Sequence, residues 1–105
     1  MGEAEAGVTV VSVLRLVVRA GAGDELARLY EDLEIFERAR RSGGFRGGRL
    51  LRPLEAGGPF VVLAEWDDAA AYRRWLANPV RAELGERIEP LLAGEVAAGE
   101  LFEEA

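Results

Sequence analysis

Hydrophobic and polar positions along two stretches of the chain follow the pattern of β-strands. Residues 8–19 and 59–66 are rich in β-branched and aromatic residues, and successive side chains of a strand point to opposite faces of a sheet. In the first stretch one face carries Val8, Val10, Ser12, Leu14, Leu16 and Val18, and the other carries Thr9, Val11, Val13, Arg15, Val17 and Arg19. In the second stretch the two faces carry Phe60, Val62, Ala64 and Trp66, and Val61, Leu63 and Glu65. Both faces of both predicted strands are therefore largely apolar.

Two further stretches predict weaker strands. Residues 45–54 and 94–102 alternate less clearly and contain glycines, and the first of them also contains Pro53. Glycine, proline and charge are typical of strands at the edges of a sheet.

Helical spacing predicts the elements between the strands. Leu26, Leu29, Tyr30, Leu33 and Phe36 recur at the period of one helix, which we expect to run from an Asp24 N-cap to the glycines at 43 and 44.

Local capping residues predict two shorter helices after the third strand. Asp67 and Asp68 suit the start of a helix that carries Tyr72 and Trp75. Asn78, followed by a proline at the first helical position, suits the start of the next helix, which Pro90 tightens or ends.

The order of elements is that of an α+β fold. It predicts a ferredoxin-like βαββαβ arrangement with a four-stranded antiparallel sheet, in which strands 8–19 and 59–66 are central. A length of 105 residues suits one domain. We expect a flexible leader over residues 1–7 and a single domain over residues 8–105.

A sheet with two apolar faces needs another part of the protein, or a partner, packed against each face. The predicted helices can cover only one face, and an antiparallel sheet normally leaves its other face polar. A monomer would expose a large apolar patch, so we expect a homodimer that packs sheet against sheet. The alternatives are that a ligand or the terminal segments cover that face.

Composition narrows the chemistry. A net charge of −6 argues against a nucleic-acid partner, and the longest apolar stretch is too short and too polar to span a membrane. The first residues are acidic and lack the basic start of a signal peptide, so we expect a cytoplasmic protein.

There is no His or Cys, and the only Met is Met1. The commonest metal ligands, general bases and thiol nucleophiles are thus missing, and we expect no metal site.

Three motifs resemble one known family. The passage 60–75, FVVLAEWDDAAAYRRW, is similar to the signature of the antibiotic biosynthesis monooxygenase (ABM) family, in which a strand ending in Glu-Trp leads into a helix with an aromatic pair. Residues 42–52, SGGFRGGRLLR, resemble its Gly-Phe turn before a strand, and residues 78–81, NPVR, resemble its polar-Pro helix start. The resemblance extends over residues 8–102.

The resemblance implies a dimeric α+β barrel. It also implies a monooxygenase that oxidises a quinol or polycyclic phenol of the aromatic polyketide type with molecular oxygen as co-substrate and no metal or flavin cofactor. Many members carry a His where this chain has Val80 and Arg81. That departure leaves the base unassigned and argues against the haem-degrading branch, because no ordinary axial ligand remains.

Three residues are candidates for catalysis. Trp66 is either a core residue or a pocket wall whose indole N–H holds a substrate oxygen. Tyr72 either packs or orients a phenol and donates a proton to a peroxy intermediate. Arg15, in mid-strand, either pairs with Glu65, reaches the dimer interface, or stabilises a phenolate or oxyanion.

Three further residues are candidates for substrate binding. Trp75 either packs on its helix or contacts the substrate. Asn78 is first of all a helix N-cap, and Arg81 either faces solvent or the pocket. Tyr30 and Phe36 are assigned to the core beneath the first helix.

Three functions remain open. The first is the cofactor-independent monooxygenase acting on a small aromatic substrate. The second is a polyketide cyclase or isomerase on the same scaffold, which would use proton transfer and need no oxygen. The third is a non-catalytic ligand-binding dimer, which the absence of His and Cys favours.

Overall fold

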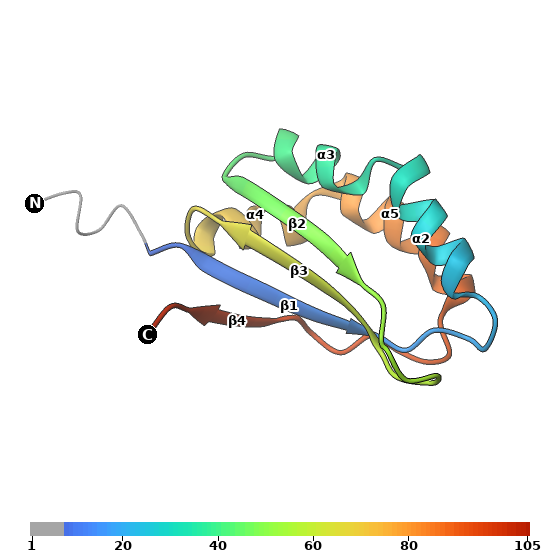
Figure 1. Ribbon diagram of the computed structural model, residues 1–105. Helices are drawn as coiled ribbons and strands as arrows, with labels where there is room; N and C mark the ends of the chain where they lie inside the picture. Colours follow the sequence, from blue (N-terminus) through green and yellow to red (C-terminus); the bar gives the residue numbers. More distant parts are fainter. Residues whose placement is uncertain (1–7) are drawn as a thin grey trace, which may run out of the picture.

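The computed structural model describes residues 8–105, and the predicted leader at residues 1–7 lies outside the described residues. Figure 1 shows a sheet with helices on one side. In chain order the elements are β1 (Val10–Leu16), α2 (Gly23–Asp32), α3 (Ile35–Arg41), β2 (Phe45–Leu51), β3 (Phe60–Trp66), α4 (Ala69–Ala77), α5 (Pro79–Ile88), the 3₁₀ turn η1 (Glu89–Leu91) and β4 (Glu100–Glu103).

The sheet has the predicted topology. Its four strands are antiparallel and lie in the order β2-β3-β1-β4, so β1 and β3 are central and the two weaker strands are at the edges. The α+β, ferredoxin-like prediction is confirmed.

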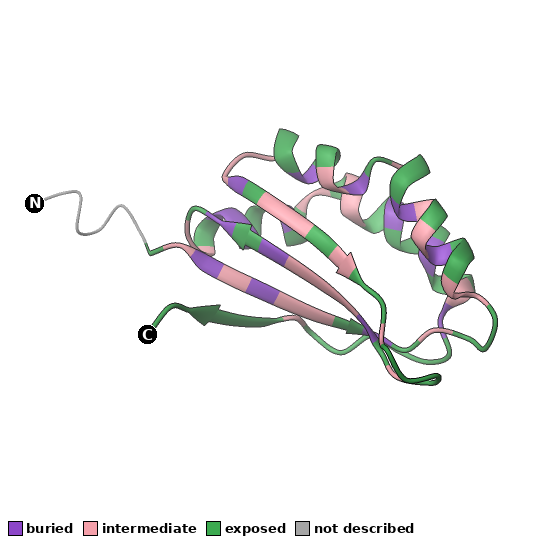
Figure 2. Ribbon diagram, viewed as in Figure 1, coloured by how far each residue is buried: buried purple, intermediate pink, exposed green. Residues whose placement is uncertain are grey.

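Strand register assigns each side chain to a face. Trp66 lies opposite Val10 and Ala64 lies opposite Ser12, and all four are buried on the face that the helices cover. We call this the covered face. The other face, which we call the open face, carries Val11, Val13, Val61, Leu63 and Glu65 from the central strands. Figure 2 shows buried and less buried positions alternating along the central strands, as a sheet with one covered face requires.

The predicted first helix is in fact two helices. Glu34 adopts a left-handed conformation with φ of 52°, which separates α2 from α3. In one straight helix, six residues turn the side chain about 120° away, so Tyr30 and Phe36 would face different directions. The break instead allows both rings to face the sheet. The predicted Asp24 N-cap is wrong, because α2 begins at Gly23 without a side-chain cap and Asp24 pairs with Arg52 at 2.9 Å.

The capping predictions after β3 are confirmed. The Asp68 carboxylate accepts a hydrogen bond of 2.8 Å from the Ala71 N–H at the start of α4. The Asn78 side-chain oxygen accepts one of 2.9 Å from the Val80 N–H, and a proline opens α5. Pro90 lies in η1, which tightens the end of α5 as predicted.

The last strand is shorter than predicted. The Ala93 N–H donates to the Val17 carbonyl at 2.8 Å, and Leu92 forms an isolated bridge with Val18. The chain then leaves the sheet over residues 94–99 and pairs with β1 again only from Glu100. The prediction of a strand from residue 94 is therefore wrong, because glycines at both ends of this segment let the chain bend away from β1.

Helix length sets one further limit. The longest helices of residues 8–105 have ten residues, and none is long and apolar enough to cross a bilayer.

Candidate functional site

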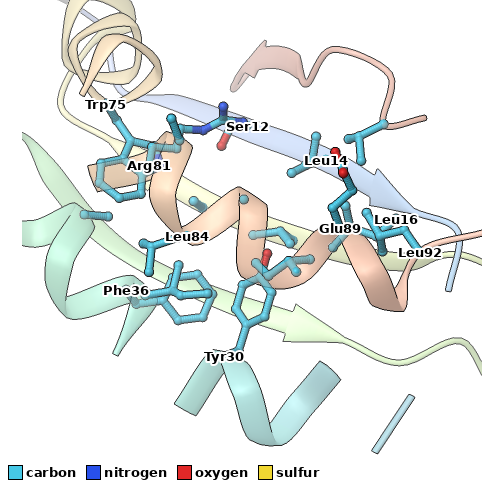
Figure 3. Close-up of a pocket in the computed structure, with 18 of the residues that line it drawn as sticks. Ser12, Leu14, Leu16, Tyr30, Phe36, Trp75, Arg81, Leu84, Glu89 and Leu92 are labelled. Carbon is cyan, nitrogen blue, oxygen red and sulfur yellow. The ribbon is translucent and has the colours of Figure 1, made fainter. Parts of the chain in front are cut away.

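A cavity of about 380 Å³ lies between the covered face and the helices. Strands β1, β2 and β3 form its floor, and side chains of α2, α3, α4 and α5 form its walls and roof. In the close-up of Figure 3, Ser12 and Leu14 of β1 lie across the cavity from Tyr30 of α2 and Phe36 of α3. Much of the lining is aliphatic, from Leu14, Leu16, Val62, Leu84, Ile88 and Leu92. A concave, mainly apolar space with a few polar groups is typical of a small-molecule site.

A continuous row of five aromatic rings lines this cavity. Tyr30 and Phe36 have ring centroids 5.8 Å apart, and Phe36 stacks on Phe45 at 6.0 Å with planes only 9° apart. Phe45 meets Trp66 edge to face at 5.1 Å, and Trp66 meets Tyr72 in the same way at 5.6 Å. These geometries are favourable for aromatic pairs, and the row offers flat apolar surface to a planar ligand.

A glycine makes room for the row. A Cβ atom at Gly48 would lie 2.8 Å from two ring carbons of Phe36 and 3.1 Å from the ring of Phe45. Any larger residue in this position of β2 would push the stacked pair apart. The glycine that marks β2 as a weak strand in the sequence therefore also shapes the cavity.

Trp66 lies at the cavity wall, one of the two placements left open for it, but its N–H already has a hydrogen-bond partner. The indole Nε1–H donates a buried hydrogen bond of 3.0 Å to the Ser12 hydroxyl oxygen. Ser12 is the one buried polar residue among residues 8–105. Because its oxygen accepts from Trp66, the Ser12 O–H proton is left to point elsewhere, including toward a ligand. The two side chains thus act as one polar unit at the cavity floor.

Tyr72, from α4, packs its ring edge to face against Trp66. Its ring is buried, and its hydroxyl lies against Gly99, where a Cβ atom would overlap it. The 94–99 segment therefore bends out of the sheet next to the Tyr72 hydroxyl, and Gly94, Glu95 and Val96 of that segment line the cavity. Tyr72 stands at the rim that this segment forms.

Trp75 and Arg81 also line the cavity, as predicted for substrate-binding residues. Arg81 is half-buried at the start of α5, and it forms no ion pair with any of residues 8–105. Burial raises the pKa of the Tyr30 hydroxyl to about 12, while the Arg81 charge acts in the opposite direction and lowers it. An unneutralised cation beside an apolar cavity favours a ligand that carries or develops negative charge.

Two predicted site residues lie outside the cavity. Arg15 is on the open face, largely exposed, and its Nε lies 3.6 Å from a carboxylate oxygen of Glu100 on β4. Of the roles open to Arg15, the structure does not bring it to the cavity, because the alternation of β1 turns it away from Ser12. It also pairs with Glu100 and not with Glu65. Asn78 does not line the cavity, because its side chain caps α5.

The sequence analysis missed several lining residues. Ser12, Tyr30 and Phe36 all line the cavity, although the last two were assigned to the core. Ser12 could have been recognised from the sequence, since it is the only polar residue on its face of β1. The exposed carboxylates of Glu86, Glu89 and Glu95 also line the cavity.

Comparison with known proteins agrees with the fold and indicates a family. The sequence profile described as antibiotic biosynthesis monooxygenase matches residues 9–93. No protein of curated function matches the sequence.

Three solved structures illustrate the similarity. SnoaB from Streptomyces nogalater, a cofactor-independent oxygenase, is 27% identical with a TM-score of 0.76, over 94% of this chain and 95% of its own. The haem degrader MhuD from Mycobacterium tuberculosis, with two haems bound in its active site, is 30% identical with a TM-score of 0.72, over 90% of this chain and 94% of its own. A conserved protein from Methanosarcina mazei, at 16% identity and a TM-score of 0.77 over 98% and 99% of the two chains, shows the shared fold alone.

The residues that line the cavity do not fit a haem iron. The chain has no His or Cys, and its only Met is Met1, so the usual nitrogen and sulfur ligands are missing. A tyrosinate is the remaining kind of ligand, and the raised pKa of Tyr30 disfavours it there. Among residues 8–105, no three Asp or Glu side chains come together to hold a metal ion.

Proposed function

The chain belongs to the antibiotic biosynthesis monooxygenase family, and we propose that it is a cofactor-independent monooxygenase that oxidises a quinol or polycyclic phenol in the cavity beneath its helices. Family membership and the similarity to SnoaB support a monooxygenase-type function. The observation that carries the proposed substrate class is the row of five rings from Tyr30 to Tyr72 along one cavity. A planar aromatic compound of the polyketide type matches that surface in shape and polarity.

The reaction can proceed on the substrate itself. Loss of a proton from the CH₂ group of an anthrone gives an electron-rich phenolate, which passes one electron to O₂. The resulting substrate radical and superoxide combine into a peroxide on that carbon, and loss of water leaves a carbonyl. One oxygen atom enters the product and the other leaves as water, so the electrons balance without an external reductant.

The lining residues can assist each step. Arg81 stabilises the phenolate and the developing negative charge on oxygen. The hydroxyls of Ser12 and Tyr72 are positioned to donate hydrogen bonds, and Tyr72 can supply the proton that the peroxide needs. With no His in the chain, the carboxylates of Glu86 and Glu89 at the cavity are candidate acceptors for the first proton.

Oxygen uptake tests this proposal. Purified, metal-free protein is incubated with a panel of anthrones and hydroquinones, and O₂ consumption is compared with the uncatalysed oxidation of each compound. We expect a rate above that background, with a loss of about two to three orders of magnitude in Arg81→Leu and in Tyr72→Phe, in line with the contribution of a single charge-stabilising or proton-donating group. A panel-wide rate equal to the background would contradict the proposal. Equal conversion without oxygen would instead indicate the cyclase or isomerase function.

Non-catalytic binding is the second candidate. The hydrogen bond between Trp66 and Ser12 favours it, because this bond satisfies the indole N–H that could otherwise hold a substrate oxygen. Tight binding of an aromatic compound with no oxygen uptake and no conversion would distinguish this function from catalysis.

We also propose that two copies of the chain pack open face to open face, in the cytoplasm. The open face is lined by Val11, Val13, Val61 and Leu63, and Phe102 on β4 is 51% exposed beside Val11. Covering this surface removes apolar area from water, which is the main driving force for association. The charged pair of Arg15 and Glu100 lies at the β4 side of the same face.

Sedimentation of two matched variants tests the dimer. Leu63→Glu places a charge in the middle of the open face, and we expect it to sediment as a monomer at micromolar concentration. Leu54→Glu is the control, because Leu54 is fully exposed on the loop between β2 and β3. A monomeric wild type, or equal behaviour of the two variants, would contradict the proposal.

A further inference from the structure

Tyr30 is a buried residue with an unused polar atom. It is only 8% exposed, and its ring packs against Phe36 with centroids 5.8 Å apart. Figure 3 shows its hydroxyl directed away from α2, toward the middle of the cavity. That hydroxyl makes no hydrogen bond with any of residues 8–105. The same set of residues contains no fully sealed side-chain N or O atom that lacks a partner, so the hydroxyl is reached from the cavity.

An unpaired hydroxyl in an apolar cavity needs an explanation. Phe would fill the same space, so the hydroxyl is the one group that Tyr30 adds to this apolar wall, and it is open to whatever occupies the cavity. The ring of Phe36 packs against Tyr30, and Arg81, whose charge acts on the hydroxyl from across the cavity, is a donor that cannot accept its proton. A ligand oxygen is the partner that would satisfy this hydroxyl.

The position of Tyr30 in the row of rings indicates which edge of the ligand would carry the oxygen that bonds to it. Tyr30 and Tyr72 are the first and last members of the row of rings, with Phe36, Phe45 and Trp66 between them. A planar ligand lying along the row would therefore present one edge to each hydroxyl. Figure 3 shows Arg81 across the cavity from Tyr30, beside Ser12, and its positive charge favours an electron-rich oxygen on a ligand in the cavity.

We propose that Tyr30 is a substrate-binding residue, and that its hydroxyl donates a hydrogen bond to a carbonyl or hydroxyl oxygen at the edge of the ligand farthest from Tyr72. This inference rests on the proposed function and narrows its substrate class to polycyclic aromatics that carry oxygen at both ends. The hydroxyl can donate this bond at neutral pH, since its raised pKa keeps it protonated.

A pair of probes that differ by one oxygen tests the proposal. Anthraflavic acid carries a hydroxyl group on each outer ring of anthraquinone, and its monohydroxy counterpart lacks one of them. Binding of both to wild type, Tyr30→Phe, Tyr72→Phe and Phe36→Leu is measured by quenching of tryptophan fluorescence. Trp66 and Trp75, the two tryptophans of the chain, both line the cavity and report on its occupancy.

We expect wild type to bind anthraflavic acid about 3- to 10-fold more tightly than the monohydroxy compound, the effect of one neutral hydrogen bond. Tyr30→Phe should lose that preference and bind the monohydroxy compound as wild type does. Tyr72→Phe should lose it as well, because the monohydroxy compound can then turn its one hydroxyl to Tyr30, whereas Phe36→Leu, which removes no hydroxyl, should retain it. Tyr30→Phe removes a single oxygen from a cavity-facing position, and an unchanged circular dichroism spectrum and melting curve would show that it folds.

The outcomes separate this inference from the proposed function. An equal loss of affinity for both probes, an unchanged preference in Tyr30→Phe, or no binding of either probe by wild type would overturn the role of Tyr30. If the preference depends on Tyr30 while no compound stimulates oxygen uptake, the proposed oxygenase activity fails and the binding role of Tyr30 stands. If uptake occurs and Tyr30→Phe changes no KM across the panel, the activity stands and the role of Tyr30 fails.

Discussion

The two faces of the sheet come from the same strands and serve different purposes. On the covered face, aromatic rings surround a cavity that holds a few polar groups, such as the Ser12 hydroxyl bonded to Trp66. On the open face, aliphatic side chains form a flat surface, and the charged residues pair at exposed positions, as Arg15 and Glu100 do. The comparison shows how a period of two residues divides one strand between a cavity lined by aromatic rings and an apolar outer surface.

The largest expected effect comes from removing the aromatic centre of the covered face. Trp66 is 2% exposed, contacts Phe45 and Tyr72 edge to face, and bonds Ser12. Trp66→Ala should lower the free energy of unfolding by about 3–5 kcal/mol, measured by chemical denaturation. Trp66→Phe keeps a ring but leaves Ser12 without its donor, and should cost about 1–3 kcal/mol.

A control from outside the covered face sharpens this result. Leu54→Ala changes a fully exposed side chain and should leave stability within about 0.5 kcal/mol of wild type. If Trp66→Ala were as mild as this control, the row of rings would not form the core described above.

Features that depend on neighbouring residues could be predicted from the sequence, and features that depend on tertiary packing could not. The caps at Asp68 and Asn78 were predictable because a cap involves only neighbouring residues. The break at Glu34 was not, since its left-handed conformation follows from how α2 and α3 pack on the sheet. The role of Arg15 was left open for a related reason. Alternation placed it on the face opposite Ser12, but which face of β1 joins which face of β3 is fixed only by their register.

The cavity was harder to predict from the sequence than the fold was. Helical spacing correctly turned Tyr30 toward the sheet, but spacing cannot distinguish a ring packed in a core from a ring beside a space. The outward bend of residues 94–99 was also hidden, because their composition still resembles a strand. Both features depend on tertiary packing.

An intermediate effect is expected from alkaline pH, which acts on the covered face through Tyr30. The pKa of tyrosine is 10.0 in an unperturbed chain and about 12 for Tyr30 in the folded protein. Between these values the unfolded chain loses the proton and the folded protein keeps it. The free energy of unfolding should therefore fall as pH rises from about 10 to about 12, by about 2–3 kcal/mol, while this contribution is fully present below pH 10.

The composition makes this measurement unusually clean. The chain has no Lys or Cys, whose ordinary pKa values would overlap this range, so the comparison of wild type with Tyr30→Phe isolates the Tyr30 hydroxyl. Urea denaturation of wild type, Tyr30→Phe and Tyr72→Phe at about pH 9 and about pH 11.5 measures the effect. Tyr30→Phe should lose less stability than wild type over this interval. The same loss in both proteins would show that the Tyr30 hydroxyl is not held in an apolar site.

The smallest effect is expected on the open face. The Arg15 guanidinium and the Glu100 carboxylate lie 3.6 Å apart, and their side chains are 60% and 56% exposed. Exposed pairs of this kind contribute little because water and salt screen them. Arg15→Ala should change the free energy of unfolding by less than about 0.5 kcal/mol and leave oxygen uptake unchanged, whereas Arg81→Leu, at the cavity, should lower uptake. If Arg15→Ala removed activity while sedimentation showed an unaltered assembly, then the separation of the faces would be incomplete. A residue of the open face would then be acting on chemistry that the geometry confines to the covered face.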